Sequence, residues 1–343
     1  MNKIVRAQKL RAVRVVAAAV RQDTKVLLSL RAAQAEQGGL WEFPGGKLEP
    51  RERSVSGLAR ELDEELGIRI QAATPLIRVR HRYSEKLVDL AVFDVRDWSG
   101  QPHGREGQRV EWAMLEELTA RAFPAANLPI ITAVKLPRLA MITPDLGADE
   151  AAFLIQLERC VAAGVELVQL RIRLTGDDFM RVARAATSIC ERFGTRLLLN
   201  GSVADCVASG AHGVHLNAAR LFQCHSRPLP ADQWVSASVH NLSELRQAQR
   251  IGVDFAYIAP VHATSSHPGA AVLGWEALQR LVRCAQIPVY ALGGMAVDDM
   301  GTAVRAGCQG IAMLSALWQS SAPAEMLAAC QRATAKASYR IAI

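Results

Sequence analysis

The chain of 343 residues has no Cys-x-x-Cys pair, and its seven cysteines all lie at Cys160 or beyond. This scattering excludes a disulfide framework and a structural zinc site, and it is typical of reduced, mostly buried thiols. No apolar run reaches the roughly 20 residues that a membrane-spanning helix needs. The first residues also lack the apolar core of a signal peptide. We therefore expect a cytoplasmic protein without a membrane partner.

Aromatic residues are scarce as well, at 5% of the chain, and no aromatic-basic RNA-binding pattern occurs. Helix-turn-helix and zinc-finger patterns are also missing, so a nucleic-acid polymer is not an expected partner. Positive charge is in excess, with a net charge of +7, and this favours small anionic ligands such as phosphates. The length exceeds what one hydrophobic core usually supports, so two domains are expected.

The most informative segment lies between residues 45 and 68. Apolar residues recur at helical spacing from Ser54 to Leu66 without a proline, so this stretch predicts an amphipathic helix. Glu61, Glu64 and Glu65 share one face of that helix. Three clustered carboxylates repel one another, and a hard divalent cation such as Mg²⁺ turns that repulsion into coordination. A solvated acidic helix without a ligand is the alternative interpretation.

The segment resembles the Nudix box, the signature of enzymes that hydrolyse a nucleoside diphosphate linked to another group. Every fixed position of that pattern is filled, namely by Gly46, Glu52, Arg60, Glu61, Leu62, Glu64, Glu65, Gly67 and Ile68. The resemblance implies hydrolysis of a nucleoside triphosphate to a monophosphate and pyrophosphate, with Mg²⁺ or Mn²⁺ as cofactor. It implies metal ligands at Glu61, Glu64, Glu65 and the Gly46 carbonyl, with Arg60 orienting a carboxylate and Glu52 positioning the loop or a metal.

Three further segments, at residues 40–47, 104–108 and 123–127, resemble the MutT branch of the Nudix family, whose members remove 8-oxo-dGTP. The resemblance implies that Glu106 is a further metal ligand or a catalytic base. It also implies that Asn127 hydrogen-bonds the oxidised purine, since an amide offers both a donor and an acceptor. Shaping a loop is the alternative role for Asn127.

Three more residues are candidates for binding the nucleotide. Phe43 is expected in the core or in the wall of the purine pocket, and Lys47 in the same motif is a substrate-binding candidate. Arg31 resembles the phosphate-side arginine of the family, with a surface salt bridge as its alternative role.

Residues 1–136 are expected to form the Nudix domain, an α/β/α sandwich. Strands are expected at residues 13–20, 25–30, 76–80, 87–95 and 110–112, with the first two joined in a hairpin. A second helix is expected over residues 115–122.

Residues 137–343 are expected to form a (β/α)₈ TIM barrel, because eight short aliphatic runs alternate with helical segments. The runs lie at residues 139–142, 167–170, 197–199, 213–216, 234–237, 255–259, 289–292 and 310–314. The whole chain is therefore expected to be an α/β protein of two domains.

The barrel segment resembles thiamin phosphate synthase and its relative, the TenI-type thiazole tautomerase. The matching stretches are residues 168–171, 199–200, 213–216, 238–240, 259–260, 264 and 291–295. The resemblance implies a thiamin-related phosphorylated ligand. However, Gly201 and Arg220 stand where the synthase has the aspartates that hold Mg²⁺-pyrophosphate, and His267 stands in place of a lysine. Without two acidic ligands the metal would depend on the substrate, so synthase activity is not expected.

The ends of the barrel strands still supply candidates for binding a phosphorylated ligand. They are Arg171, Arg173, Asn200, Ser238, His240, Thr264, Ser266, Gly293, Gly294 and Ser315. The loops after the last strands are where this fold usually binds phosphate. His240 has two open interpretations, because a tautomerase uses a histidine there for proton transfer and a structural histidine is equally compatible.

Three hypotheses about function remain. The first is a Mg²⁺-dependent Nudix pyrophosphatase, with 8-oxo-dGTP as the leading substrate, whose barrel binds a ligand or acts as a scaffold. The second is a bifunctional enzyme whose barrel makes thiamin phosphate or tautomerises a thiazole. The third is a Nudix enzyme that hydrolyses a thiamin-type diphosphate. The first is preferred because Asn127 and its turn match the MutT branch, whereas the third rests on domain adjacency alone.

Overall fold

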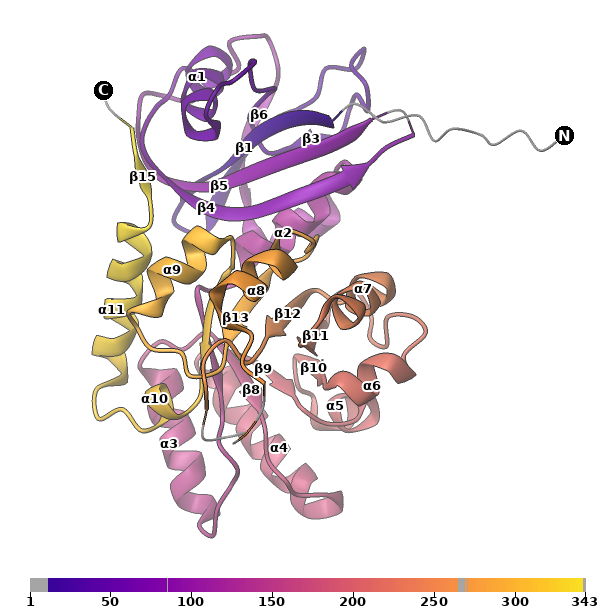
Figure 1. Cartoon of the computed structure of the whole chain (residues 1–343), viewed down its shortest axis with the longest axis vertical. Coiled ribbons are helices and arrows are strands. Elements are labelled where there is room, and N and C mark those ends of the chain that lie inside the picture. Colours follow the sequence, from indigo (N-terminus) through magenta and orange to yellow (C-terminus); the bar gives the residue numbers. More distant parts are fainter. Residues whose placement is uncertain (1–11, 85, 265–268, 270, 342–343) are drawn as a thin grey trace, which may run out of the picture. The chain divides into compact units, whose positions relative to one another are not determined.

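The computed structural model describes residues 12–84, 86–264, 269 and 271–341 (Figure 1). The chain divides into two compact units. One unit holds the chain up to Ala73, Arg78–Ile131 and the C-terminal segment from Tyr339, and the other holds Thr74–Ile77 and Thr132–Ser338. The predicted boundary between residues 136 and 137 stays a prediction.

The first unit is built on a mixed sheet. Within the described residues the strand order is β15-β4-β5-β1-β2-β3, and β6 also pairs with β2. The strands are β1 (Ala12–Gln22), β2 (Lys25–Leu30), β3 (Trp41–Glu42), β4 (Arg69–Arg82), β5 (Leu87–Ser99), β6 (Val110–Met114) and β15 (Tyr339–Arg340). All five predicted strands are confirmed, and four of them are longer than expected.

The hairpin of β1 and β2 forms as predicted. The strands pair antiparallel with Arg21 opposite Val26, and the turn is closed by Asp23, whose φ of 52° is in the left-handed region that aspartate tolerates better than most residues. On its other edge β1 pairs in parallel with β5 over nine residues, from Ala12 opposite Leu87. Residues 16–20 of β1 are buried, because the strand is central in the sheet.

The helical segments of the first unit agree only partly with the expectation. Helix α1 (Ser54–Leu66) has the predicted bounds. The expected second helix over residues 115–122 is instead a 3₁₀ helix, η1 (Leu115–Ala120), which ends where Arg121 becomes extended. Short 3₁₀ turns are common as connectors. The chain continues through η2 (Ala125–Asn127) into α2 (Leu128–Lys135).

The last strand of the first unit comes from the far end of the sequence. β15 pairs antiparallel with β4, with Tyr339 opposite Ala73, and the Tyr339 ring meets the Phe93 ring edge-on at 6.3 Å. The pairing covers an edge of the sheet that would otherwise expose unpaired backbone groups. The sheet thus includes a strand that follows the barrel in the sequence.

The second unit contains a closed barrel of parallel strands. Their order is β10-β11-β12-β13-β14-β7-β8-β9, which confirms the predicted TIM barrel. The strands are β7 (Leu139–Ile142), β8 (Leu167–Leu170), β9 (Arg196–Leu199), β10 (Gly213–Leu216), β11 (Trp234–Val239), β12 (Phe255–Ile258), β13 (Val289–Leu292) and β14 (Gly310–Met313).

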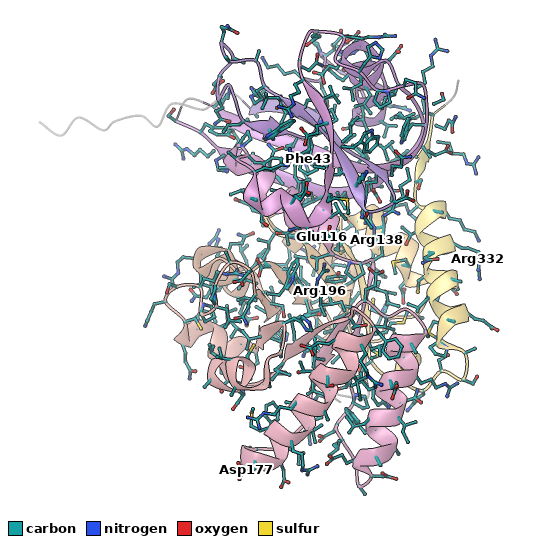
Figure 2. All side chains as sticks on the ribbon, turned by 180° about the vertical axis from the view of Figure 1, so that it is seen from behind. Phe43, Glu116, Arg138, Asp177, Arg196 and Arg332 are labelled. Atoms are coloured by element: carbon teal, nitrogen blue, oxygen red, sulfur yellow. The ribbon has the colours of Figure 1, made fainter. Side chains whose placement is uncertain are left out.

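Helices follow the barrel strands. They are α3 (Glu150–Ala162), α4 (Gly176–Arg192), α5 (Val203–Ser209), α6 (Ala218–Gln223), α7 (Leu242–Ile251), α8 (Gly274–Val282), α9 (Asp299–Ala306), α10 (Ser315–Trp318) and α11 (Pro323–Lys336). Alternate residues of the strands pack on these helices in one large core. The remaining alternate residues form a separate apolar cluster inside the barrel, as the period of two in a strand requires. Arg196, labelled in Figure 2, lies over the Trp234 ring at 5.2 Å.

Among the described residues, none of the helices combines the length and the apolar composition needed to cross a membrane.

Candidate active site

Helix α1 carries the acidic face of the first unit. Its apolar face, made by Leu58, Leu62 and Leu66, is fully buried, and each such leucine contributes about 1.5–3 kcal/mol relative to an exposed one. Gly67 ends the helix with a φ of 69° and donates its N–H to the Asp63 carbonyl, as a glycine C-cap does. The helix is thereby held with its other face free to present the glutamates.

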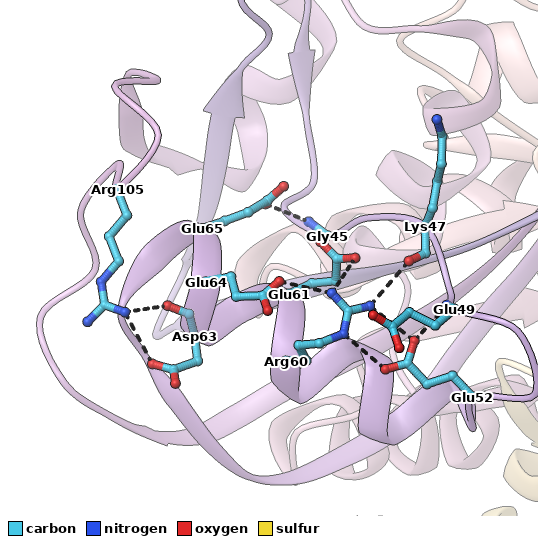
Figure 3. A network of polar contacts seen from close by, with 10 residues as sticks. All are labelled: Gly45, Lys47, Glu49, Glu52, Arg60, Glu61, Asp63, Glu64, Glu65 and Arg105. Carbon is cyan, nitrogen blue, oxygen red and sulfur yellow. Dashed lines mark hydrogen bonds and ion pairs between the residues drawn. The ribbon is translucent and has the colours of Figure 1, made fainter.

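Arg60 organises three carboxylates around its guanidinium group (Figure 3). Nε and Nη2 donate to the two carboxylate oxygens of Glu52, both at 3.0 Å. Nη1 donates to Glu64 at 2.9 Å and lies 3.0 Å from Glu61 Oε1. The two-point contact lowers the pKa of the Glu52 carboxyl. Arg60 thus positions the loop glutamate and two glutamates of the helix at once.

The loop before α1 approaches the helix closely at Gly46. A Cβ atom at this position would lie 2.1 Å from Glu61 Oε2, so only glycine leaves room for that carboxylate. The Gly46 carbonyl accepts a hydrogen bond from the Val16 N–H at 2.9 Å. A carbonyl oxygen has a second lone pair, so this bond leaves the predicted metal-ligand role of Gly46 open.

Glu65 is the most perturbed carboxyl of the site. Burial raises its pKa to about 8, and the nearby charges of Glu61, Glu106 and Glu42 act in the same direction. The hydrogen bond from the Gly45 N–H lowers this pKa but does not offset the other effects. The Gly45 N–H donates to Glu65 Oε2 at 3.2 Å. Burial also raises the pKa of Glu61. A negative charge on Glu65 is therefore unfavourable in the metal-free site, because Arg60 compensates only part of the charge of the neighbouring glutamates.

This raised pKa predicts a pH-dependent stability of the metal-free protein. The folded state keeps a proton on Glu65 up to about pH 8, whereas the unfolded state releases it near the ordinary value of 4.5. The protonated Glu65 carboxyl contributes its full stability below pH 4.5, and this contribution is lost as the pH rises through 8. The free energy of unfolding therefore falls between pH 4.5 and pH 8. Thermal unfolding in EDTA should show this fall.

The matched control is Glu65→Gln, which removes the titrating group and keeps its size. In EDTA at pH 9 this variant should unfold at a higher temperature than the wild type, and its stability should change less with pH. Equal pH dependence in the two proteins would contradict the raised pKa of Glu65.

The loop at residues 104–108 is tied to the end of α1. The Arg105 N–H donates to the Glu65 carbonyl at 2.9 Å, and Gln108 Nε2 donates to the same carbonyl at 3.0 Å. The Gln108 side chain also accepts from the Glu106 N–H at 2.9 Å. Glu106 is exposed, yet its charge acts on Glu65. The tertiary structure therefore brings this predicted residue beside the helix.

The carboxylates fit a hard divalent cation in their chemistry. Glu65 and Glu106 form no ion pair within the described residues, and the charge on Glu106 raises the pKa of Glu65. Uncompensated carboxylate oxygens of this kind are the ligands that Mg²⁺ takes in proteins. In the described part of the chain, no three His, Cys, Asp or Glu side chains converge to hold a metal. Arg60 holds Glu61 and Glu64, whereas Glu65 bonds to Gly45.

The predicted base-binding residues lie together. Asn127 is buried, and its Oδ1 accepts a hydrogen bond from the Phe43 N–H at 3.4 Å. The Phe43 ring stacks on the Phe123 ring with centroids 5.9 Å apart. Phe43, labelled in Figure 2, is itself buried. With its oxygen occupied, the Asn127 amide has NH₂ donors left for a ligand.

The two predicted phosphate-side cations are placed differently. Arg31 forms an ion pair with Glu42 and donates from Nε to the Glu36 carbonyl at 3.0 Å. Lys47 is exposed, and Figure 3 shows its side chain pointing away from the Arg60 network. Its backbone carbonyl accepts from Arg60 Nη2 at 3.3 Å. The roles of Arg31 and Lys47 toward the substrate stay predictions.

Glu42 is a member of the site that the sequence analysis does not single out. It lies in β3, burial raises its pKa, and its charge in turn raises the pKa of Glu65. The only signal in the sequence is its place in the Leu-Trp-Glu-Phe-Pro segment, two positions before Pro44. Its proximity to α1 depends on the pairing of β3 with β2, which no local pattern predicts.

Most barrel candidates gather at the carboxyl ends of neighbouring strands. Arg171 follows β8, and Asn200 follows β9 and donates its N–H to the Leu170 carbonyl at 3.0 Å. Arg173 pairs with Asp145 at 3.5 Å. Ser238 of β11 contacts His215, with Oγ 2.9 Å from Nε2. These residues therefore share one end of the barrel.

The other barrel candidates are less uniform. His240 Nδ1 lies 2.8 Å from Glu244 Oε2, so a carboxylate orients this half-exposed histidine, and both interpretations of His240 remain open. Gly293 and Gly294 have positive φ values of 99° and 64°. Thr264 is described, whereas Ser266 and His267 lie outside the described residues. Ser315 starts the short helix α10.

Comparison with known proteins connects both units to families. Residues 15–133 match the NUDIX domain family, and residues 139–317 match the thiamine monophosphate synthase family. The CTP pyrophosphohydrolase of Escherichia coli K12 is 37% identical over 128 residues, which are 37% of this chain and 95% of that protein. The 8-oxo-dGTP diphosphatase of the same organism is 36% identical over 114 residues, or 33% of this chain and 88% of that protein.

A relative of the barrel is the thiamine-phosphate synthase of Thermosynechococcus vestitus, with 31% identity over 170 residues. The match covers 49% of this chain and 48% of that protein, so the chain spans about half the length of this relative. Together with the closed eight-stranded barrel and the acidic helix of the first unit, these matches confirm both predicted resemblances. The chain belongs to the Nudix family through its first unit and to the thiamine monophosphate synthase family through its barrel.

Proposed function

We propose that the first unit is a divalent-metal-dependent pyrophosphohydrolase that cleaves a nucleoside triphosphate, with 8-oxo-dGTP as the leading substrate. The products are the nucleoside monophosphate and pyrophosphate. The observation that supports the proposal is the set of glutamates around Arg60, in which Glu65 has no cationic partner among the described residues. Hydrolysis of an oxidised nucleotide would sanitise the nucleotide pool and so serve DNA repair.

The residues that would hold Mg²⁺ or Mn²⁺ are Glu61, Glu64, Glu65, Glu106 and the Gly46 carbonyl. A bound cation neutralises the polyphosphate and lowers the pKa of a bound water. Arg60 keeps Glu52, Glu61 and Glu64 oriented through its hydrogen bonds and ion pairs. Glu64, whose side chain is 58% exposed, faces solvent and is the residue that takes the proton from the attacking water.

The purine is proposed to bind against Phe43 and Asn127. The Phe43 N–H donates to Asn127 Oδ1, so the NH₂ group of the amide is left as the donor for a ligand. An oxidised guanine offers carbonyl oxygens that accept from such a donor. The names of the relatives include both a purine and a pyrimidine substrate, and Asn127 beside stacked aromatic rings favours the purine.

Replacing Asn127 by alanine is expected to weaken the selectivity for the oxidised base. The preference for 8-oxo-dGTP over dGTP, measured as the ratio of kcat/KM values, is expected to fall by roughly tenfold or more, because a lost buried hydrogen bond leaves a polar group of the ligand unpaired. This ratio is measured for the wild type and the variant as pure proteins with Mg²⁺, and CTP and thiamin diphosphate are tested as substrates in the same panel.

Leu128→Ala is the matched control, since Leu128 is the next residue and 54% exposed. It should keep the wild-type ratio. An unchanged ratio in Asn127→Ala would show that Asn127 only shapes the loop. A large preference of the wild type for CTP or thiamin diphosphate would overturn 8-oxo-dGTP as the substrate.

We further propose that the barrel does not act as a synthase. Gly201 supplies no carboxylate, and a Cβ there would already lie 3.1 Å from the Phe179 ring. Arg220 supplies a cation where the second acidic ligand is needed. Incubation with the pyrimidine diphosphate and the thiazole phosphate should give no thiamin phosphate above the uncatalysed rate. Product formation at enzymatic rates would show that the barrel is active and the protein bifunctional.

A further inference from the structure

Two guanidinium groups at the carboxyl end of the barrel have no carboxylate partner among the described residues. Arg171 directly follows β8, and its backbone N–H donates to Thr143 Oγ1 at 2.9 Å. Arg220 lies in α6 after β10, and its Nη1 donates to Asn200 Oδ1 at 3.1 Å. Both side chains are half-buried. A positive charge that is partly withdrawn from water and unpaired favours an anionic ligand.

Asn200 connects the two arginines. Its backbone N–H donates to the carbonyl of Leu170, the residue before Arg171, because β8 and β9 are neighbours in the barrel. Its side-chain oxygen is taken by Arg220, which leaves the amide NH₂ group as a donor. The three residues therefore present only hydrogen-bond donors to a ligand at this end of the barrel.

The carboxylates at the same end are already engaged. Asp145 accepts from the Arg173 N–H at 2.8 Å and pairs with the Arg173 guanidinium. Glu244 accepts from the His240 N–H at 2.6 Å. Asp205 accepts from the Ser202 N–H at 3.1 Å. A divalent cation takes carboxylate oxygens as ligands, whereas each of these three carboxylates already accepts a backbone N–H.

The interior of the barrel below this end is filled by aromatic rings. Phe255, Tyr257 and Tyr290 pack together with ring centroids 5.6 to 5.7 Å apart, and all three are fully buried. Burial and the neighbouring Arg220 lower the pKa of His215 to about 3, so this histidine is uncharged. An anion must therefore bind at the mouth of the barrel, where Arg171 and Arg220 supply the positive charge.

We propose that the barrel mouth binds a phosphorylated small molecule directly through Arg171, Asn200 and Arg220, without a divalent cation. A guanidinium fork donates two parallel hydrogen bonds to phosphate oxygens, and the Asn200 amide adds another donor. Arg220 then takes the part that a bridging metal ion plays in a site with free carboxylates. The site is separate from the glutamates of the first unit, so it stands independently of the proposed hydrolysis.

The test uses the full-length protein and inorganic pyrophosphate as the probe. Isothermal titration calorimetry in excess EDTA should show binding of pyrophosphate. Arg220→Gln should raise the Kd by roughly 10- to 100-fold, because the hydrogen bonds from the guanidinium to the phosphate oxygens are lost together with its positive charge. Arg171→Gln should raise Kd on the same scale. Hydrolysis of the nucleotide by the first unit should stay at the wild-type rate in Arg220→Gln.

Arg173→Gln is the matched control, since Arg173 is exposed and paired with Asp145. Its Kd should stay within roughly threefold of the wild type. Arg220→Lys keeps the charge without the fork, and it should bind with intermediate affinity, with melting curves checking that each variant is folded. Binding that needs added Mg²⁺, no binding at millimolar pyrophosphate, or a wild-type Kd in folded Arg220→Gln or Arg220→Lys would each overturn the proposal.

Discussion

Replacing Glu64 by glutamine is expected to lower kcat for nucleoside triphosphate hydrolysis by on the order of 100-fold or more, the scale of general-base and electrostatic catalysis. The structure explains why the effect should fall on kcat. Glutamine keeps the size of the side chain and an oxygen that can accept from Arg60 Nη1, as Glu64 Oε2 does at 2.9 Å. It can neither accept a proton nor supply negative charge to a metal ion. Steady-state kinetics with saturating Mg²⁺ measure the change.

Stability should hardly change in this variant, because the Glu64 side chain is 58% exposed and exposed ion pairs contribute little. The matched control is Asp63→Asn, which removes one negative charge from the adjacent position of α1. Asp63 Oδ1 lies 3.5 Å from Arg105 and its side chain is about half exposed, so this variant should keep nearly wild-type kcat. An unchanged kcat in Glu64→Gln would remove Glu64 from the mechanism.

The second large effect is expected for Arg60→Lys. A lysine keeps the positive charge but has no planar fork, so it cannot hold both oxygens of Glu52 while also bonding Glu61 and Glu64. Residues that orient metal ligands typically change metal affinity or activity by roughly 10- to 100-fold when replaced. We expect kcat/KM to fall by that amount and the Mg²⁺ concentration for half-maximal activity to rise.

The Mg²⁺ dependence separates this positioning role from a purely structural one. A variant that was only less stable would lose activity equally at every Mg²⁺ concentration, whereas Arg60→Lys should recover part of its activity when Mg²⁺ is raised. Arg105→Lys is the control on the same face, because Arg105 donates to the Asp63 carbonyl at 2.8 Å outside the Arg60 network. A wild-type Mg²⁺ dependence in Arg60→Lys would contradict the positioning role.

The features that local sequence predicted well are those set by neighbours in the chain. Helix α1 has the predicted bounds because apolar spacing and a glycine cap act within a few residues of each other. The barrel strands were found for a similar reason, since each is a short aliphatic run between helical segments. The 3₁₀ helix η1 was expected as a longer helix, because periodicity alone does not distinguish a single short 3₁₀ segment from an α-helix.

Other features depend on residues that are far apart in the sequence. β15 pairs with β4 although 266 positions separate Tyr339 from its partner Ala73, and the ring of Tyr339 meets the ring of Phe93. The coupling of Glu42 to Glu65 and the hydrogen bond from Phe43 to Asn127 likewise join separate elements. Such contacts follow from strand register and packing of the whole sheet, which no local pattern contains.

The sequence by itself determined the families, the position of the acidic helix and the number of barrel strands, because each depends on residue types at short, regular spacing. Only the tertiary structure decided which charges remain uncompensated. It placed Arg60 among three glutamates but left Glu65 facing a backbone N–H, and it placed Arg220 against Asn200 instead of a carboxylate. The reason is physical: the charge state and partners of a side chain depend on burial and on neighbours within a few ångströms, and folding brings most of those neighbours from elsewhere in the chain.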